Sequence, residues 1–256
     1  MKDFIDSDDQ ALLERHGLAS FEALWALELH AVDEPNKAPR GGWSTVYRLD
    51  LEGQGYYLKR QSNYLTHSLE RPWGEPTLAR EFRNIRRYQR LDIPAMSAAF
   101  YAERRISGER RAVLLTHALD GWKDLYSWLP EWRQLAAEQR QAIVSACGRL
   151  ARRVHEQGQV HGCFYPKHIF LQPRDDGFAA QLIDLEKTRP LFFGERDRVK
   201  DLEPLLRRTN PWNEADHLGF LTAYLGSGQQ VDHWSQRLTA RLKDCLLYTS
   251  PSPRDS

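Results

Sequence analysis

Three reactive side chains lie close together in the stretch "QVHGCFYPKHIFL", residues 159–171: His161, Cys163 and His168. An imidazole exchanges a proton near neutral pH, and a cysteine becomes a nucleophile once it is a thiolate. Asp184 follows in "LIDLEKTR", where a carboxylate at the end of an apolar run suits a divalent metal ion. These residue types allow proton transfer, nucleophilic attack or metal-assisted chemistry.

A lysine and a glutamate upstream could form an ion pair. Lys59 lies in "YYLKRQ", whose alternation predicts a strand, and Glu81 lies in the amphipathic segment 75–93, which predicts a helix. A lysine with apolar neighbours needs a partner or a path to water. A strand lysine paired with a helix glutamate holds nucleotide phosphates in kinases, so we predict this pair. Two unrelated surface charges are the alternative.

The segment "RGGWSTVYRL" has the composition of a turn that covers phosphates. Gly41 and Gly42 permit close approach of the backbone to a ligand, and Ser44 offers a hydroxyl. The segment lacks the full G-x-G-x-x-G pattern, however, and Trp43 is bulky for such a site. An ordinary turn is the alternative interpretation.

Hairpins and helices must position these groups. Alternating residues predict one β-hairpin over 39–61 and a second with strands in "MSAAFYAERR" and "RRAVLLTHAL". The continuous apolar run "AVLLT" predicts a central, buried strand. A long amphipathic helix is expected over 132–158, followed by short strands in "HIFLQ" and "AAQLIDL" and then by three helices.

This order of elements predicts an α+β chain with a mainly β N-lobe and a mainly α C-lobe. We expect the N-lobe, with short N-terminal helices, over 1–119. The helical C-lobe, over 120–244, carries the candidate catalytic and metal loops. The last segment, 245–256, is rich in Ser and Pro and resembles a translated sequencing adaptor, so we expect it to be a non-native tail; an ordinary disordered tail is the alternative.

Composition limits the classes of partner. The net charge of the 256 residues is +1, which argues against a nucleic-acid-binding protein. Two segments dense in arginine, 80–90 and 103–111, are either solvated faces or a patch for an anionic partner, such as a phosphorylated glycolipid or an acidic membrane surface. The three cysteines have no paired spacing, and no signal peptide or transmembrane segment is evident, so a cytoplasmic protein is expected.

Taken together, the motifs resemble the Kdo/WaaP lipopolysaccharide kinases, and within them the InaA-like proteins. The resemblance covers roughly residues 39–205 and rests on "GGWSTVYRLDL", "YYLKRQ", "GEPTLAREFRNIRRYQRL", the loop "HGCFYPKHIFL" and "LIDLEK". It implies a protein-kinase-like two-lobed fold. It also implies ATP-dependent phosphorylation of a sugar or glycolipid hydroxyl with Mg²⁺, at the inner face of the inner membrane.

Position by position, the resemblance implies a role for each candidate. Lys59 and Glu81 match the phosphate-binding pair, Asp184 matches the metal-binding aspartate, and Asp201 matches the aspartate that braces the catalytic loop. His161 matches the structural histidine that leads this loop, and His168 stands where kinases generally have asparagine. Cys163 is the departure, because family members with established sugar-kinase activity carry aspartate there.

This departure leaves three hypotheses open. The chain is an active kinase with an altered loop, or a pseudokinase-like regulatory protein that binds nucleotide, or an enzyme that uses Cys163 as a nucleophile. A general base contributes about 10²- to 10⁴-fold to a rate, and a thiol near pKa 8.5 is a poor one. His168 could handle a proton instead. Since imidazole is a poor ligand for Mg²⁺, that role suits it better than a second metal site.

Overall fold

The computed structural model describes residues 3–38, 41–67 and 71–249, with side chains up to Arg241. It divides into two compact units, Met1–Asp120 and a second unit that begins at Gly121. Within the described residues, no helix is both long and apolar enough to cross a membrane.

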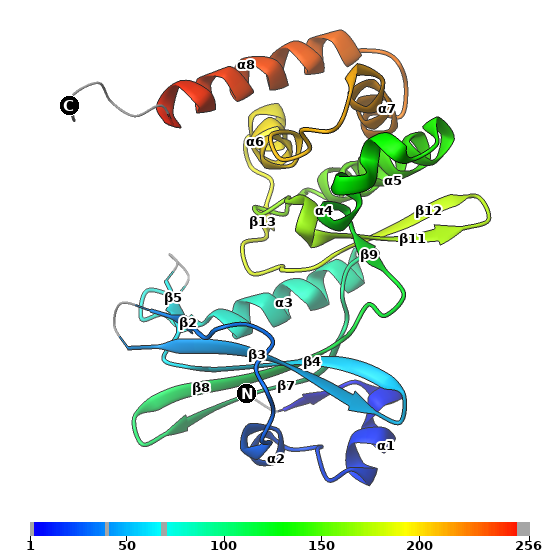
Figure 1. Ribbon diagram of the computed structural model, residues 1–256. Helices are drawn as coiled ribbons and strands as arrows, with labels where there is room; N and C mark the ends of the chain where they lie inside the picture. The colour runs from blue at the N-terminus through cyan, green and yellow to red at the C-terminus, as the bar shows by residue number, and fades with distance from the viewer. Residues whose placement is uncertain (1–2, 39–40, 68–70, 250–256) are drawn as a thin grey trace, which may run out of the picture. The chain divides into compact units, whose positions relative to one another are not determined.

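The first unit is built on an antiparallel six-stranded sheet with the order β1-β7-β8-β4-β3-β2 (Figure 1). Its strands are β1 (Phe4–Ile5), β2 (Asn36–Lys37), β3 (Trp43–Leu51), β4 (Gln54–Ser62), β7 (Ala98–Ile106) and β8 (Glu109–His117). Both predicted hairpins, β3–β4 and β7–β8, are confirmed. The apolar strand β8 is indeed central, because it lies between β7 and β4.

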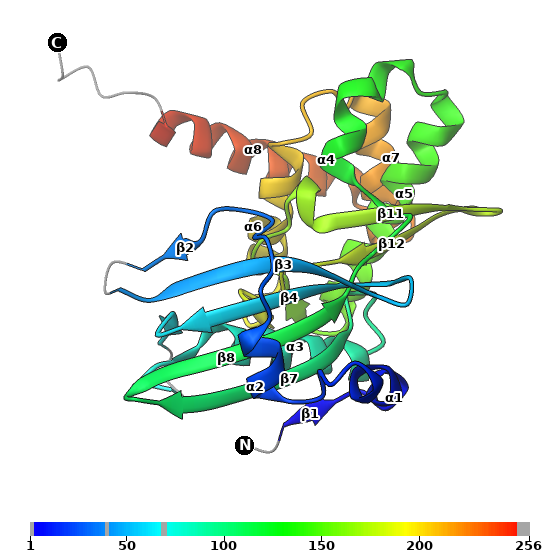
Figure 2. The same cartoon turned by 60° about the horizontal axis from the view of Figure 1, so that its bottom comes forward.

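Helices cover both faces of this sheet. The predicted helix is α3 (Thr77–Arg90), which lies across one face (Figure 1). The two short N-terminal helices, α1 (Ser7–Arg15) and α2 (Phe21–Ala26), lie on the other face (Figure 2). A small strand pair, β5 (Leu65–Thr66) with β6 (Glu75–Pro76), precedes α3, so the helix begins two residues later than the sequence suggested.

The core of the first unit forms where α1 and α2 pack on the sheet. Its large apolar side chains include Leu13, Phe21 and Leu24 from the helices and Leu58 and Phe100 from the strands, all buried. Burial of side chains of this size typically contributes about 1.5–3 kcal/mol each, so this layer holds the sheet rigid. The opposite face of the sheet is therefore a firm support for the polar groups that it carries.

The second unit is mainly helical and includes a small three-stranded sheet of order β12-β11-β9. Its helices are α4 (Leu125–Trp128), the 3₁₀ helices η1 (Leu129–Gln134) and η2 (Pro166–His168), α5 (Ala137–Glu156), α6 (Gly194–Leu206), α7 (Glu214–Leu225) and α8 (Val231–Thr249). Its strands are β9 (Lys123–Asp124), β10 (Gln159–Val160), β11 (Ile169–Arg174), β12 (Gly177–Leu182) and β13 (Arg189–Pro190).

Two expectations about helix ends differ from the structure. The helix expected over 132–158 is wrong at its start, because η1 occupies 129–134 and α5 begins only at Ala137. Leu135 is extended at this break, and Trp132 turns inward so that its indole nitrogen donates a hydrogen bond to Asp216. At the other end, α8 continues through 245–249 of the expected tail. The rest of that tail lies outside the described residues.

Candidate functional site

Lys59 and Glu81 form the ion pair that the sequence suggested. The Lys59 Nζ lies 2.6 Å from the Glu81 Oε1, and the side chains are 21% and 4% exposed. β4 supplies the lysine and α3 supplies the glutamate. A carboxylate buried this deeply needs a cation, so the pair fixes the lysine end at one point of the sheet while leaving part of it accessible.

A glutamine that sequence reasoning missed fixes the start of α3. The N-cap position, Pro76, has no side-chain hydrogen bond. Instead the Gln61 Oε1 accepts from the Thr77 hydroxyl at 2.8 Å and from the Leu78 amide at 2.9 Å. Since Gln61 lies two residues after Lys59 on the same strand face, one strand holds both the first turn of α3 and its Glu81. The two-residue spacing of Lys59 and Gln61 in the predicted strand could have indicated from sequence that both side chains face α3.

Successive side chains of β3 point to opposite faces of the sheet, so the residues of the predicted phosphate-covering turn are divided between the two faces. Val46 is the cross-strand partner of Lys59, so Ser44, two residues earlier, shares the face that carries the lysine. Trp43 projects from the opposite face, where its ring lies 5.7 Å from that of Trp25. A pocket of about 430 Å³ lined by Trp43, Thr45 and Tyr47 therefore does not share the face of Lys59.

The two glycines of this turn lie in the connection from β2 to β3. Gly41 has φ +86°, a conformation that favours glycine. A Cβ at Gly42 would collide with the backbone oxygen of Asn63, so this glycine is required for packing against the end of β4. The expected role in covering phosphates stays a prediction, and Gly42 has a packing role beside it.

In the second unit, Asp201 braces the loop that contains His161 and Cys163. Its carboxylate accepts hydrogen bonds from the amides of His161 at 2.8 Å and Gly162 at 2.7 Å, and it lies 3.1 Å from the His155 Nε2. Burial acts to raise the pKa of Asp201, but the hydrogen bond and charge of His155 outweigh it and hold the pKa below its usual value. The buried carboxylate, which α6 supplies, thus stays ionised and anchors the loop.

His161 joins this loop to the segment that carries Asp184. Its Nε2 lies 3.0 Å from the carbonyl oxygen of Ile183, and its Nδ1 accepts a hydrogen bond from the Cys163 amide at 3.3 Å. These partners fix the proton on Nε2. Burial lowers the pKa of His161, so the ring is neutral. The ring thus connects two backbone segments, and the role expected for His161 in the loop stays a prediction.

The next link fixes Asp184 itself. The Ile183 amide donates to the carbonyl oxygen of His168 at 3.1 Å, so both backbone groups of Ile183 are held by the loop. β12 ends at Leu182, and Asp184 has φ +60°, in the left-handed region. Such a conformation is strained in a residue other than glycine and often marks a functional position. Here it directs the carboxylate toward the loop.

His168 lies against Asp184. The imidazole is buried, its Nδ1 lies 2.9 Å from the carbonyl oxygen of Cys163, and its Nε2 lies 3.4 Å from the Asp184 Oδ2. Burial lowers the pKa of His168, and the charge of Asp184 opposes this only in part. His168 and Asp184 are therefore brought together as a nitrogen and an oxygen donor.

Cys163 is 2% exposed at the centre of this loop. Burial, followed by the charge of Asp184, raises the pKa of the Cys163 thiol, although Lys187 acts against both. A neutral, buried thiol is a weak nucleophile and a weak base. These features weigh against the hypothesis in which Cys163 is a nucleophile.

The His168 nitrogen and the Asp184 oxygen could hold a divalent cation only together with further ligands. Across the described chain, no group of three or more His, Cys, Asp or Glu side chains could hold a metal ion unaided. Ions bound with nucleotides usually take one or two protein ligands and complete their shell with phosphate oxygens and water. The His168–Asp184 pair fits such a site.

The first unit also carries a basic surface, which we call the arginine surface: Arg71, Trp73, Arg105 and Arg110. Two pockets of about 410 and 440 Å³ define it, and both are lined by Glu103 and Arg110. Arg105 pairs across the hairpin with Arg110, and within the described residues no acidic partner contacts Arg105. Like charges directly opposite one another are unfavourable unless an anion lies between them.

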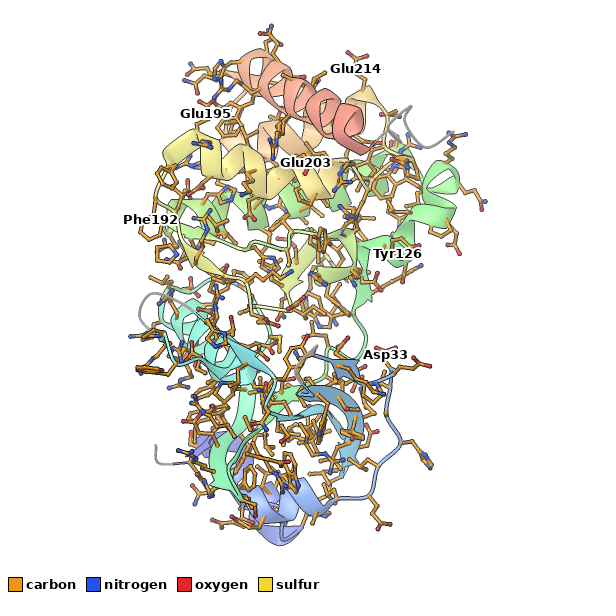
Figure 3. All side chains as sticks on the ribbon, turned by 90° about the vertical axis from the view of Figure 1, so that its left-hand side faces the viewer. Asp33, Tyr126, Phe192, Glu195, Glu203 and Glu214 are labelled. Carbon is orange, nitrogen blue, oxygen red and sulfur yellow. The ribbon has the colours of Figure 1, made fainter. Side chains whose placement is uncertain are left out.

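Exposed aromatic side chains accompany both units. Trp73, on the arginine surface, is 90% exposed. In the second unit, Tyr126 and Phe192 are exposed, and Figure 3 shows Phe192 projecting outward from the segment before α6. Phe193 lies beside Phe192 and is exposed as well. Large exposed apolar groups of this kind often mark contact surfaces.

Comparisons with known proteins agree with the sequence and the fold. The E. coli (strain K12) protein named InaA is 30% identical over 198 residues, which cover 77% of this chain and 91% of that protein. A solved structure of WaaP in complex with acyl carrier protein has a TM-score of 0.71 at 22% identity and covers 98% of this chain and 100% of that one. The chain therefore has a kinase-like fold of the WaaP type. The model of the lipopolysaccharide kinase (Kdo/WaaP) family matches residues 22–224, and the chain belongs to this family.

Proposed function

We propose that the protein is an ATP-dependent phosphotransferase that phosphorylates a hydroxyl of a sugar or glycolipid with the help of a divalent cation. The observation that carries this proposal is the Lys59–Glu81 ion pair, with its 2.6 Å contact, in a member of the lipopolysaccharide kinase family. A buried carboxylate that orients a lysine has a clear purpose if the lysine binds phosphate.

Each polar group then has a role in phosphoryl transfer. Lys59 neutralises charge on the phosphates of ATP, and Ser44 lies on the same strand face. Asp184, with His168, would hold the cation. A bound cation would offset the negative charge that develops on the phosphate oxygens during transfer. His161 and Asp201 act as positioning residues, because they fix the backbone on either side of Cys163 and Asp184.

Removal of the proton from the acceptor hydroxyl is the weak step. Cys163 occupies the position of the base, and its raised pKa leaves it neutral at pH 7. Because the proton leaves late in phosphoryl transfer, turnover can continue at a reduced rate without a carboxylate. The specific alternative, which the same thiol favours, is a pseudokinase-like regulatory protein that binds nucleotide and transfers nothing.

The partners proposed for this activity are a nucleotide, a sugar or glycolipid acceptor, and an anionic membrane surface. Support for the membrane contact comes from the arginine surface, where a highly exposed tryptophan adjoins arginines, as interfacial segments of peripheral proteins do. We accordingly propose a cytoplasmic protein that works at the inner face of the inner membrane.

A thermal-shift titration with ATP and a divalent cation tests the nucleotide site. The unaltered chain is expected to gain several degrees in its unfolding temperature, and Lys59→Ala and Asp184→Ala are each expected to lose most of that gain. Lys200→Ala, an exposed lysine of α6, is the matched control. If the unaltered chain shows no shift, the proposal fails. A shift retained by both variants would mean that the nucleotide binds elsewhere.

A further inference from the structure

The hydrogen bonding of His168 leaves one ring nitrogen as a ligand. The carbonyl oxygen of Cys163, 2.9 Å from Nδ1, can only accept a hydrogen bond, so Nδ1 carries the proton. In this tautomer Nε2 has a free lone pair, and it faces the Asp184 Oδ2. Two acceptors that face one another need a proton or a cation between them.

The distance between these atoms distinguishes a proton from a metal ion. A charged N–H···O bond is usually about 2.7–2.9 Å long, whereas Nε2 and Oδ2 are 3.4 Å apart. Two donors that each lie about 2.1 Å from one ion are about 3.0–3.4 Å apart when they subtend roughly 90–110°. The spacing therefore suits two ligands of a single ion better than a direct ion pair.

The donor types select among cations. Mg²⁺ prefers oxygen ligands, whereas imidazole nitrogen suits first-row transition ions, whose affinities for a mixed site rise above that of Mg²⁺. Because the described residues bring only two side-chain donors together here, the ion must also accept water and phosphate oxygens, as Mn²⁺ does. We propose that His168 and Asp184 chelate a divalent transition ion, with Mn²⁺ as the working ion, in preference to Mg²⁺.

This selectivity rests on the proposed function, because nucleotide phosphates supply the remaining ligands. It also changes the expectation from sequence that His168 handles a proton. His168 thereby acquires a role that the usual asparagine does not have. With an amide oxygen at this position, the site would offer oxygen donors alone and discriminate less between the two ions.

Electron paramagnetic resonance of Mn²⁺ gives a direct test that needs no activity. With a non-hydrolysable ATP analogue bound, the spin-echo spectrum of Mn²⁺ on the full chain is expected to show coupling to a ¹⁴N nucleus. His168→Asn is expected to abolish this coupling, and His233→Asn, an exposed histidine of α8, is expected to keep it. Bound Mn²⁺ without nitrogen coupling would overturn the proposal.

Competition between the ions provides the second measurement. Mg²⁺ is titrated against bound Mn²⁺, and this displacement gives the dissociation constant of each ion. The dissociation constant of Mg²⁺ divided by that of Mn²⁺ is expected to be at least ten-fold lower in His168→Asn than in the unaltered chain. An unchanged ratio contradicts the proposal. The titrations are repeated without nucleotide, where the unaltered chain should still bind Mn²⁺ more tightly than His168→Asn does. Absence of nucleotide binding would thus defeat the proposed function while the cation preference is judged separately.

Discussion

At the scale of single residues, the loop from His161 to His168 combines strong positioning with a weak base. Asp201 and His161 hold its backbone through hydrogen bonds of 2.7–3.3 Å. Cys163 sits at the centre of this rigid arrangement as a neutral thiol. The backbone of the loop is therefore firmly held, and under the proposed function the side chain at position 163 determines how well the loop can accept a proton.

Under the proposed function, Cys163→Asp is expected to raise the rate of phosphoryl transfer to a sugar acceptor by about ten- to a hundred-fold, the lower part of the range for general-base catalysis. The gain is modest because the hydroxyl proton leaves late. Lys187, which interacts with the thiol, would stabilise the new carboxylate. Initial rates with labelled ATP measure the effect. Cys163→Asn, similar in shape but unable to accept a proton, is the control, and equal rates for the two variants would contradict the prediction.

Asp201→Asn is expected to destabilise the fold by about 2–4 kcal/mol, because it weakens the hydrogen bonds to the amides of His161 and Gly162 and leaves the buried His155 without its carboxylate. The midpoint of urea denaturation measures this change. Asp232→Asn applies the same substitution at an exposed position of α8 and should leave the midpoint unchanged. A similar midpoint for both variants would show that Asp201 is not an anchor.

At the scale of elements, hydrophobic and alternating patterns predicted the two hairpins of the sheet, the helix α3 and the α+β order. These patterns succeed because burial determines which face of a strand or helix is apolar. They failed at η1, where the inward turn of Trp132 and its bond to Asp216 replace the first turn of the expected helix. That bond joins residues far apart in the chain, so a local pattern does not contain it.

The same limit applies to the candidate site. Lys59 and Glu81 could be paired from sequence because a strand lysine followed by a helix glutamate is a recurrent arrangement. The 3.4 Å distance between His168 and Asp184 could not be predicted from sequence, since it depends on the left-handed backbone at Asp184 and on the hydrogen bonds to Ile183. The sequence therefore supplied candidate residues, and the tertiary structure determined which of their donors face one another.

The start of α6 yields a prediction about pH. Asp197 accepts hydrogen bonds from Arg189 and from the amides of Phe192 and Phe193, and the Arg189 contact is the main reason that the pKa of Asp197 lies well below its usual range. A depressed pKa in the folded state stabilises the protein above the unfolded value of about 3.9. This stabilisation is lost as the pH falls toward the folded value.

Asp197→Asn should therefore lower the stability by about 1–3 kcal/mol at pH 7, and the difference from the unaltered chain should shrink below about pH 4. Thermal unfolding at a series of pH values measures both effects. Asp176→Asn, in the exposed turn between β11 and β12, should show neither effect. A difference that stays constant down to the lowest pH would mean that the charge of Asp197 does not stabilise this segment.

At the scale of the whole molecule, the family match over residues 22–224 includes most of both units. Each unit supplies some of the candidate site residues. The first unit contributes the Lys59–Glu81 pair and, separately, the arginine surface. The sheet face that carries Lys59 belongs to the nucleotide proposal. The arginine surface has no role in that chemistry, and its exposed tryptophan beside arginines supports a separate contact with an anionic partner.

We expect the full chain to bind vesicles rich in phosphatidylglycerol and not vesicles of phosphatidylcholine alone. Arg105 and Arg110 would contact lipid phosphates, each contributing about 1 kcal/mol, and Trp73 would enter the interface. Reversal of both charges to glutamate should weaken binding at least ten-fold, and Trp73→Ala should weaken it independently. Co-sedimentation measures the bound fraction, and binding should fall as salt is added.

The matched control reverses Arg133 and Arg196, two exposed arginines of the second unit, so that net charge changes equally. If this variant loses as much binding as the Arg105–Arg110 variant, attraction is set by net charge and the arginine surface is not the contact. If neither vesicle type is bound, the arginine surface is not a membrane contact. A specific loss at Arg105, Arg110 and Trp73 would place the first unit against the membrane, where the proposed glycolipid acceptor would be reached.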